Sequence, residues 1–166
     1  MFNGLEYFVP NLLDLVKESG IDVSDYLMDH VCCRTFDMSS FESIFARWRM
    51  FASRVHTSEV NGRPIHALFL EKQFTISGRI VRVIELPAPK PGQTYPEGWE
   101  HVEFVVDETL ERFMSRYKTH QFDTKSLNGE LNSAVGLPLS FGLRAKFHQL
   151  PLERMIEIEL AQLAQT

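Results

Sequence analysis

The feature that most constrains this chain is the order of its strand-like and helix-like segments, because one order occurs twice. In the first half, residues 30–35 predict a strand, and residues 41–51 carry apolar side chains at the three- and four-residue steps of a helix. Three more strands are expected, at 54–60, 65–70 and 79–86. Asn61-Gly62 is typical of a tight hairpin turn. The first half therefore predicts β-α-β-β-β.

The second half repeats this order after a Pro/Gly-rich connection at 87–99. Residues 101–106 alternate polar and apolar side chains as a half-buried strand does. A helical stripe and a closing strand at 144–150 follow, the stripe being formed by Leu110, Phe113, Met114 and Tyr117. Residues 121–142 are expected to hold two short strands with glycines at the turns, namely Gly129, Gly136 and Gly142.

Helices are predicted at both ends of the chain. Residues 5–18 have helical spacing, and Pro10 marks a point where that helix starts or kinks. Pro151 suits the first turn of a helix over 152–163. We therefore expect a single α+β domain over 1–166, made of an N-terminal helical addition (1–27), a first βαβββ module (28–90), a second βαβββ module (98–150) and a C-terminal helix (151–166).

Composition and charge narrow the function classes. The chain has 166 residues, of which 44% are hydrophobic and 23% charged, as in ordinary globular proteins. Its net charge of −5 argues against nucleic acid or an anionic membrane as a partner. No run approaches the ~20 apolar residues of a membrane span, and the N-terminus does not read as a signal peptide. Cys32 and Cys33, as strand neighbours, point to opposite faces, and two such thiols predict a cytoplasmic protein.

Four candidate metal ligands occupy matching places in the two halves. His30 lies near the start of the first strand and Glu85 near the end of the fourth, while His101 starts the fifth strand and His148 lies near the end of the eighth. Strand alternation places His30, Cys32 and Arg34 on one face, opposite Val31 and Cys33. The pattern therefore predicts polar strand faces that line a cavity and apolar faces that pack against helices.

Several short motifs carry a resemblance to a known family over roughly residues 25–160. They are Asp29-His30 with Arg34, Asn61-Gly62-Arg63-Pro64-Ile65, Glu85-Leu86-Pro87, Tyr95 with Glu97-Gly98-Trp99-Glu100-His101, and Lys146-Phe147-His148. In order and spacing the chain resembles YecM-like proteins of the vicinal oxygen chelate superfamily, which includes glyoxalases. The resemblance implies paired βαβββ modules in one cupped, mixed sheet, with helices on its outer face and a divalent metal ion inside.

The resemblance also implies roles for the candidate residues. His30, Glu85, His101 and His148 would bind the metal, and imidazole and carboxylate ligands suit zinc, nickel, iron or manganese without choosing among them. Glyoxalase-like sites usually end with a glutamate on the last strand. Glu157 or Glu159 would therefore replace His148 if their segment were a strand rather than a helix. Glu85 is the expected catalytic base, since such a glutamate can leave the metal.

The remaining polar residues leave alternatives open. Arg34 and Lys146 either bind a substrate anion or are simply solvated or paired with Glu103. Whether His66 points inward or outward from its strand stays undecided. The resemblance implies a metal-dependent isomerase, lyase or dioxygenase acting on a small oxygenated anion, or else a non-catalytic small-ligand-binding or protein-interaction domain with a vestigial site. The expected partner is a small molecule, and the expected state is a monomer or a homodimer.

Overall fold

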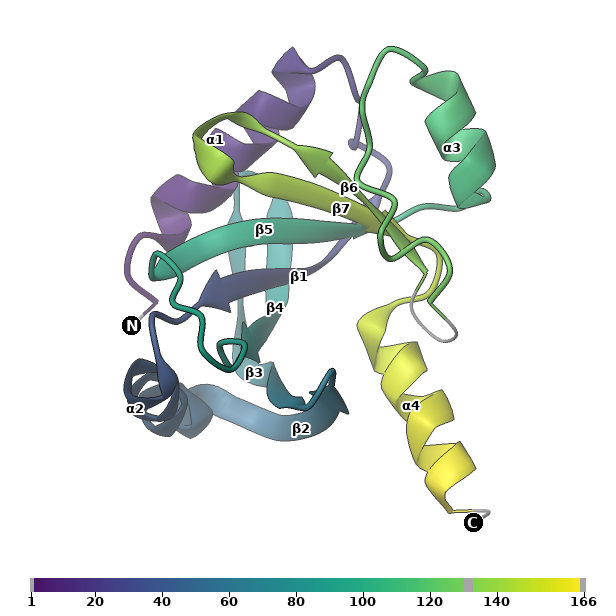
Figure 1. Ribbon diagram of the computed structural model, residues 1–166. Helices are drawn as coiled ribbons and strands as arrows, with labels where there is room; N and C mark the ends of the chain where they lie inside the picture. Colours follow the sequence, from purple (N-terminus) through teal and green to yellow (C-terminus); the bar gives the residue numbers. More distant parts are fainter. Residues whose placement is uncertain (1, 130–132, 165–166) are drawn as a thin grey trace. The chain divides into compact units, whose positions relative to one another are not determined.

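The computed structural model describes residues 2–129 and 133–164 (Figure 1). Its elements are, in order, α1 (Leu5–Glu18), β1 (Leu27–Arg34), α2 (Met38–Trp48), the 3-10 turn η1 (Arg49–Phe51), β2 (Ala52–Val60), β3 (Arg63–Ile76), β4 (Arg79–Pro87), β5 (Gly98–Val105), α3 (Leu110–Arg116), β6 (Ala134–Pro138), the 3-10 turn η2 (Ser140–Gly142), β7 (Arg144–His148) and α4 (Leu152–Leu163). The strands form a mixed sheet in the order β2-β3-β4-β1-β5-β7-β6. This confirms the predicted α+β class.

The chain divides into two compact units. The first comprises residues 1–11 and 30–101, and the second comprises residues 12–29 and 102–166. The division into modules at 28–90 and 98–150 is a different partition, and it stays a prediction.

The first unit is built on β1 and a β2-β3-β4 meander. β2 pairs with β3 and β3 with β4, both antiparallel, whereas β4 pairs with β1 in parallel. The β2–β3 turn has positive φ angles at Asn61 (53°) and Gly62 (71°), as a two-residue hairpin turn requires. The strands expected at 65–70 and 79–86 are present and form this antiparallel β3–β4 pair.

Helix α2 of the first unit begins at a reciprocal cap. The Asp37 side chain accepts a hydrogen bond from the Ser40 backbone N–H, and the Ser40 hydroxyl accepts one from the Asp37 N–H. These bonds satisfy donors that a helix start would otherwise leave open. The helix then buries Phe41, Ile44 and Trp48, as its apolar periodicity predicted.

The second unit packs its core around three aromatic rings. Phe113 on α3 lies 4.4 Å from Phe147 on β7, between ring centroids, and Phe147 lies 5.7 Å from Phe104 on β5. β6 and β7 form an antiparallel pair. The same alternation that buries Phe104 and Phe147 turns Glu103 and His148 toward the other face of their strands.

Several segments differ in detail from the sequence predictions. Helix α1 runs through Pro10 without a break. Gly136 lies within β6 rather than at a turn, while Gly142, with a φ of 74°, does lie in one. Of the two strands expected within 121–142, the structure shows β6 and an isolated bridge from Asp123 to Gly136. Residues 130–132 of that segment lie outside the described residues.

The C-terminal segment forms a helix over Leu152–Leu163, as predicted. Within the described residues, no helix combines the length and the apolar character that crossing a membrane requires.

Candidate metal centre

Two strands of the first unit bring His30 and Glu85 together. β1 and β4 pair in parallel with Cys32 opposite Glu85, so His30, two residues before Cys32, shares the face of Glu85. The Nε2 atom of His30 lies 3.8 Å from Oε2 of Glu85. His30 is only 2% exposed, whereas the Glu85 side chain is 18% exposed. The pair therefore joins a buried imidazole to a carboxylate that solvent reaches.

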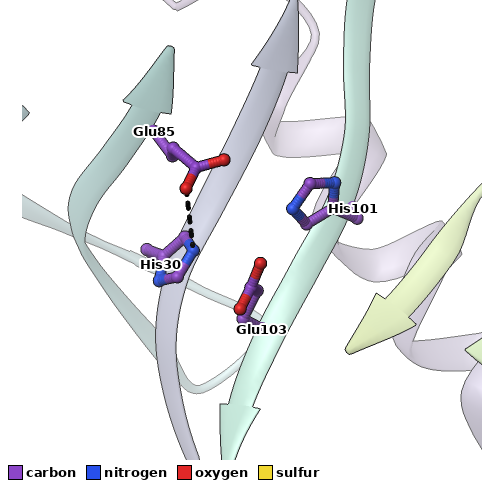
Figure 2. Close-up of side chains that lie close together, drawn as sticks. All are labelled: His30, Glu85, His101 and Glu103. Carbon is purple, nitrogen blue, oxygen red and sulfur yellow. Dashed lines mark ion pairs between the residues drawn. The ribbon is translucent and has the colours of Figure 1, made fainter. Parts of the chain in front are cut away.

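His101 on β5 is the third member of this group. Its side chain is as deeply buried as that of His30. Figure 2 shows His30, Glu85 and His101 turned toward one another, with Glu103 two residues further along β5. One ligand atom from each of His30, Glu85 and His101, all in the first unit, lies within 4.8 Å of the others. Imidazole nitrogens and carboxylate oxygens this close together are a ligand set that divalent metals accept.

Glu100 determines which nitrogen of His101 can bind a metal. Its Oε2 atom lies 3.0 Å from Nδ1 of His101. Burial alone would raise the pKa of Glu100, but hydrogen bonds from His101 and Arg34 outweigh it and lower the pKa to about 2. An ionised carboxylate only accepts, so Nδ1 of His101 carries the proton. In a neutral ring, Nε2 then presents the lone pair, which is the usual arrangement of metal-binding histidines.

Arg34 joins the same carboxylate. Its Nε atom donates to Oε2 of Glu100 at 2.5 Å, and its guanidinium lies 4.8 Å from the centre of the Tyr95 ring. The side chains of Arg34 and Glu100 are about one-fifth exposed. Arg34 thus supports the residue that orients His101.

His148 lies in the second unit, beside two carboxylates of that unit. Its Nε2 atom is 3.7 Å from a carboxylate oxygen of Asp29 and 3.7 Å from one of Glu103. Its Nδ1 atom lies 2.7 Å from the carbonyl oxygen of Leu150, which only accepts, so Nδ1 carries the proton here as well. In a neutral ring, Nε2 of His148 therefore carries the lone pair that a metal ligand needs.

The alternative fourth ligands lack the strand that they would require. Glu157 and Glu159 belong to helix α4, and Glu157 is exposed and pairs with Arg154 at 2.7 Å. The condition for exchanging His148 for either glutamate is therefore not met.

The two candidate anion-binding residues both contact carboxylates. Lys146 donates to Oε1 of Glu103 at 2.8 Å in the second unit, as Arg34 does to Glu100 in the first. The sequence allows either cation to pair with Glu103; Lys146 makes that pair, whereas Arg34 pairs with Glu100. The Lys146 pair is compatible with a further contact to a ligand, because an ammonium group has three donors.

The other three histidines, His56, His66 and His120, contact aromatic rings or polar groups outside the candidate metal site. His66 stacks on Phe45 and Phe41 of α2, with ring centroids at 3.9 and 4.9 Å, which settles its orientation toward the helix. Burial lowers the pKa of His66. His120 lies 2.8 Å from the carbonyl oxygen of Ser19, and His56 lies 3.1 Å from the hydroxyl of Ser58.

Sequence reasoning treated Glu103 only as a pairing partner of a cation and gave no role to two other acidic residues at these groups, Asp29 and Glu100. A signal existed for Glu103, because it lies two residues from His101 in one strand and so shares its face. Asp29 is the direct neighbour of His30, and it is only 2% exposed. It accepts a hydrogen bond from the Leu152 N–H at 3.0 Å, at the start of α4, and no pattern in the sequence indicates that contact.

Comparison with known proteins gives one family match. Residues 1–149 match the family model described as "YecM protein". Over 103 residues, or 61% of this chain and 53% of the relative, the sequence is 36% identical to an uncharacterized protein of Haemophilus influenzae. Over 106 residues, or 61% of this chain and 54% of the relative, it is 27% identical to Protein YecM of Escherichia coli. The chain thus spans about half the length of these curated relatives.

Solved structures show similar folds. A structural-genomics protein, EC4020, superposes with a TM-score of 0.76 at 23% identity, covering 93% of this chain and 88% of that one. A hypothetical protein of Bacillus halodurans, BH1468, gives a TM-score of 0.50 at 14% identity, covering 76% of this chain and 96% of that one. At these identities, the likeness concerns the fold alone.

Proposed function

The chain belongs to the YecM family, and on that premise we propose that it binds a divalent metal ion through His30, Glu85 and His101. The observation that carries the proposal is the convergence of their ligand atoms within 4.8 Å, two of them on side chains that are 2% exposed. Polar groups are seldom buried so closely without a compensating partner, because losing their hydration is costly.

The negative charge of Glu85 and the tautomer of His101 both favour a cation at this site. Glu85 contributes a carboxylate beside the imidazole of His30, and Glu100 holds the proton of His101 on Nδ1. A divalent ion would offset the carboxylate charge and accept the lone pairs of neutral imidazoles. The ligand types suit zinc, nickel, iron or manganese.

We propose His148 as the fourth ligand, which makes a set of three histidines and one glutamate. Its protonated Nδ1 and its buried position, at 1% exposure, support this role. Asp29 and Glu103 each place a carboxylate oxygen 3.7 Å from this Nε2 atom, where their negative charge would favour a cation.

The reaction that we propose is that of a metal-dependent isomerase, lyase or dioxygenase on a small oxygenated anion. When bound, the metal would supply Lewis acidity toward the oxygen atoms of such a molecule. Glu85 is the proposed base, because its carboxylate is more exposed than the two imidazoles and can exchange a proton with a bound molecule. Arg34 and Lys146 would orient the anion.

One observation favours a second candidate, a binding protein without catalysis. The two cations that would attract an anionic substrate already contact carboxylates, Arg34 that of Glu100 and Lys146 that of Glu103. Part of their charge is therefore compensated. In either case we expect a small-molecule partner and a monomer or homodimer. Cys32 and Cys33 are both buried thiols, which fits the cytoplasmic location that we propose.

Elemental analysis of the purified protein tests the metal proposal. We expect one equivalent of a divalent transition metal in the wild type and its loss in His101→Ala. Chelation should lower the melting temperature of the wild type but not that of His101→Ala. The matched control is His56→Ala, which removes a histidine of β2 outside the group and should keep the metal. A full equivalent in His101→Ala would show that the site is wrong.

A further inference from the structure

The guanidinium of Arg34 is held at one edge and on one face. Its Nε donates to Oε2 of Glu100 at 2.5 Å, and its central carbon lies over the Tyr95 ring, 4.8 Å from the ring centre. Tyr95 belongs to the connection between β4 and β5, so two segments of the first unit fix this cation. A side chain that is already fixed loses little further freedom when it binds a ligand.

The far end of the same guanidinium is open. Among the residues that the structure describes, neither Nη atom of Arg34 makes a hydrogen bond or an ion pair. Nor do these two atoms belong to the polar side-chain atoms of that part of the chain that are buried without a partner. The Arg34 side chain is 21% exposed. Solvent therefore reaches the Nη N–H donors, which are available to an anion.

The open end belongs to the same cluster as the candidate metal ligands. Arg34 shares a strand face with His30, because the two are four residues apart in β1. The Glu100 oxygen that accepts from Arg34 also lies 3.0 Å from Nδ1 of His101. A single carboxylate oxygen thus joins Arg34 to a proposed ligand. A small molecule that contacts the metal can therefore place an anionic group at Arg34.

Shape decides which anion fits the open end. The two Nη groups present parallel N–H bonds in the plane of the guanidinium, which match the two coplanar oxygens of a carboxylate. A phosphate is tetrahedral, so its other oxygens project out of that plane. The Tyr95 ring covers one side of the plane. The arrangement therefore favours a carboxylate over a phosphate.

We propose that Arg34 binds a carboxylate end-on through its two Nη groups, and that Tyr95 is the positioning residue that holds the guanidinium for it. The carboxylate site itself needs no metal, because Glu100 and Tyr95 form it. Its role in substrate recognition rests on the proposed function. There it names the substrate class, since the small oxygenated anion is then a carboxylic acid whose carboxylate lies at Arg34.

Propionate and propionamide test the site, because they have the same shape and differ in charge and in the second acceptor oxygen. An NMR titration of the full chain follows the Nε–H signal of Arg34, which comparison with Arg34→Lys assigns. We expect propionate to shift this signal and to bind about tenfold more tightly than propionamide, as a charge-assisted pair does. Inorganic phosphate should bind more weakly than propionate. Equal affinities for propionate and propionamide, or tighter binding of phosphate, would overturn the proposal.

The titration is made with the metal-loaded protein and again after chelation, which separates this proposal from the metal proposal. We expect the preference for propionate to persist without metal. A preference that disappears with the metal would place the carboxylate on the metal and would overturn the role of Arg34. A purified protein that contains no metal but prefers propionate would contradict the metal proposal alone.

Substitutions assign the two roles. Arg34→Lys keeps the charge but lacks the paired donors, so the preference for propionate should fall at least about threefold. Tyr95→Leu should weaken propionate about threefold and leave propionamide unchanged, and Tyr95→Phe should restore the wild-type ratio. Arg47→Lys, at an exposed arginine of α2, is the control and should change neither affinity.

An unchanged ratio in Arg34→Lys would overturn the carboxylate site. An unchanged ratio in Tyr95→Leu would exclude the positioning role of Tyr95. If a variant does not fold, the affinities of the wild type for the three probes decide the question alone.

Discussion

The Oε2 atom of Glu100 lies 3.0 Å from Nδ1 of His101, and the same oxygen accepts a hydrogen bond from Arg34 at 2.5 Å. One carboxylate therefore fixes the tautomer of a proposed ligand and is itself held by a cation. Partners of this kind are part of a metal site, because they orient the ligand and keep the correct nitrogen unprotonated.

Replacing Glu100 by Gln should weaken metal binding without removing it. The amide lacks the charge that holds the proton on Nδ1 of His101, so we expect the metal affinity to fall by about tenfold or more. A competition titration against a chromogenic chelator measures the change. Glu97→Gln, which neutralises an exposed carboxylate three residues earlier, is the control and should leave the affinity unchanged. Equal affinities for the two variants would exclude an orienting role.

The fourth ligand can be identified by a pair of substitutions. His148→Ala should lower the metal affinity at least about tenfold, the effect expected even for residues that only support a metal ligand. Glu157→Gln should have no effect, because Glu157 is exposed on helix α4. The same competition titration applies. An unchanged affinity in His148→Ala would leave His30, Glu85 and His101 as the site and remove His148 from it.

Stability should decline in mildly acidic solution because of His66. Burial lowers the pKa of His66 below its ordinary value of 6.5, so the unfolded chain binds this proton more readily than the folded one. The contribution of neutral His66 to the free energy of unfolding is complete above pH 6.5, and it is lost as the pH falls toward the pKa of His66 in the folded protein. Urea denaturation of wild type and His66→Phe between about pH 5 and pH 8 should give a steeper loss for the wild type. Parallel curves would contradict this.

Cys33 should resist alkylation in the folded protein. Burial, together with the nearby charge of Glu97, raises the pKa of the Cys33 thiol to about 12, so it remains protonated near neutral pH. The thiolate is the reactive form. We expect iodoacetamide at about pH 8 to modify Cys33 rapidly only after unfolding in urea, as localised by tandem mass spectrometry. Rapid modification of the folded protein would show that the thiol is accessible and ionised.

The turn between β2 and β3 should depend on its glycine. Gly62 has a φ of 71°, which a residue with a side chain adopts only under strain. We expect Gly62→Ala to lower the free energy of unfolding by about 1 kcal/mol. The matched control is Gly136→Ala, whose added Cβ would meet the Cβ of Asp123 at 3.5 Å, an ordinary contact. Chemical denaturation compares the two, and a larger loss for the control would contradict the argument.

The sequence predicted the strand faces well because alternation is a local property. It placed His30 on the same face as Cys32, and the register of Cys32 with Glu85 confirms that His30 and Glu85 share a face. The pairing of β1 with β4 joins segments about fifty residues apart, and no local pattern in the sequence indicates it. Pro151 was a similar local signal, because it indicated that the segment after it is a helix rather than a last strand. The structure has α4 there.

The same alternation gave no indication of the contact between Glu100 and His101. Neighbours in an ideal strand point to opposite faces, yet the Glu100 side chain reaches the ring of the next residue. Residues 121–133 carry no clear period, and in their described part the structure shows one isolated bridge rather than a full strand. Without a period, neither the face nor the register of such a segment follows from its sequence.

The division of the chain into two units sets an order in which they can fold during synthesis. All residues of the first unit lie at or before His101, whereas the second unit needs residues 12–29 together with residues 102–166. A nascent chain can therefore complete the first unit early. Leu12, Val16 and Ile21, which are at most 1% exposed in the finished fold, belong to a unit whose other residues, 102–166, are synthesised later. Closing that long loop makes the second unit the slower one. The interval before its closure is the period in which the nascent chain is most exposed to aggregation.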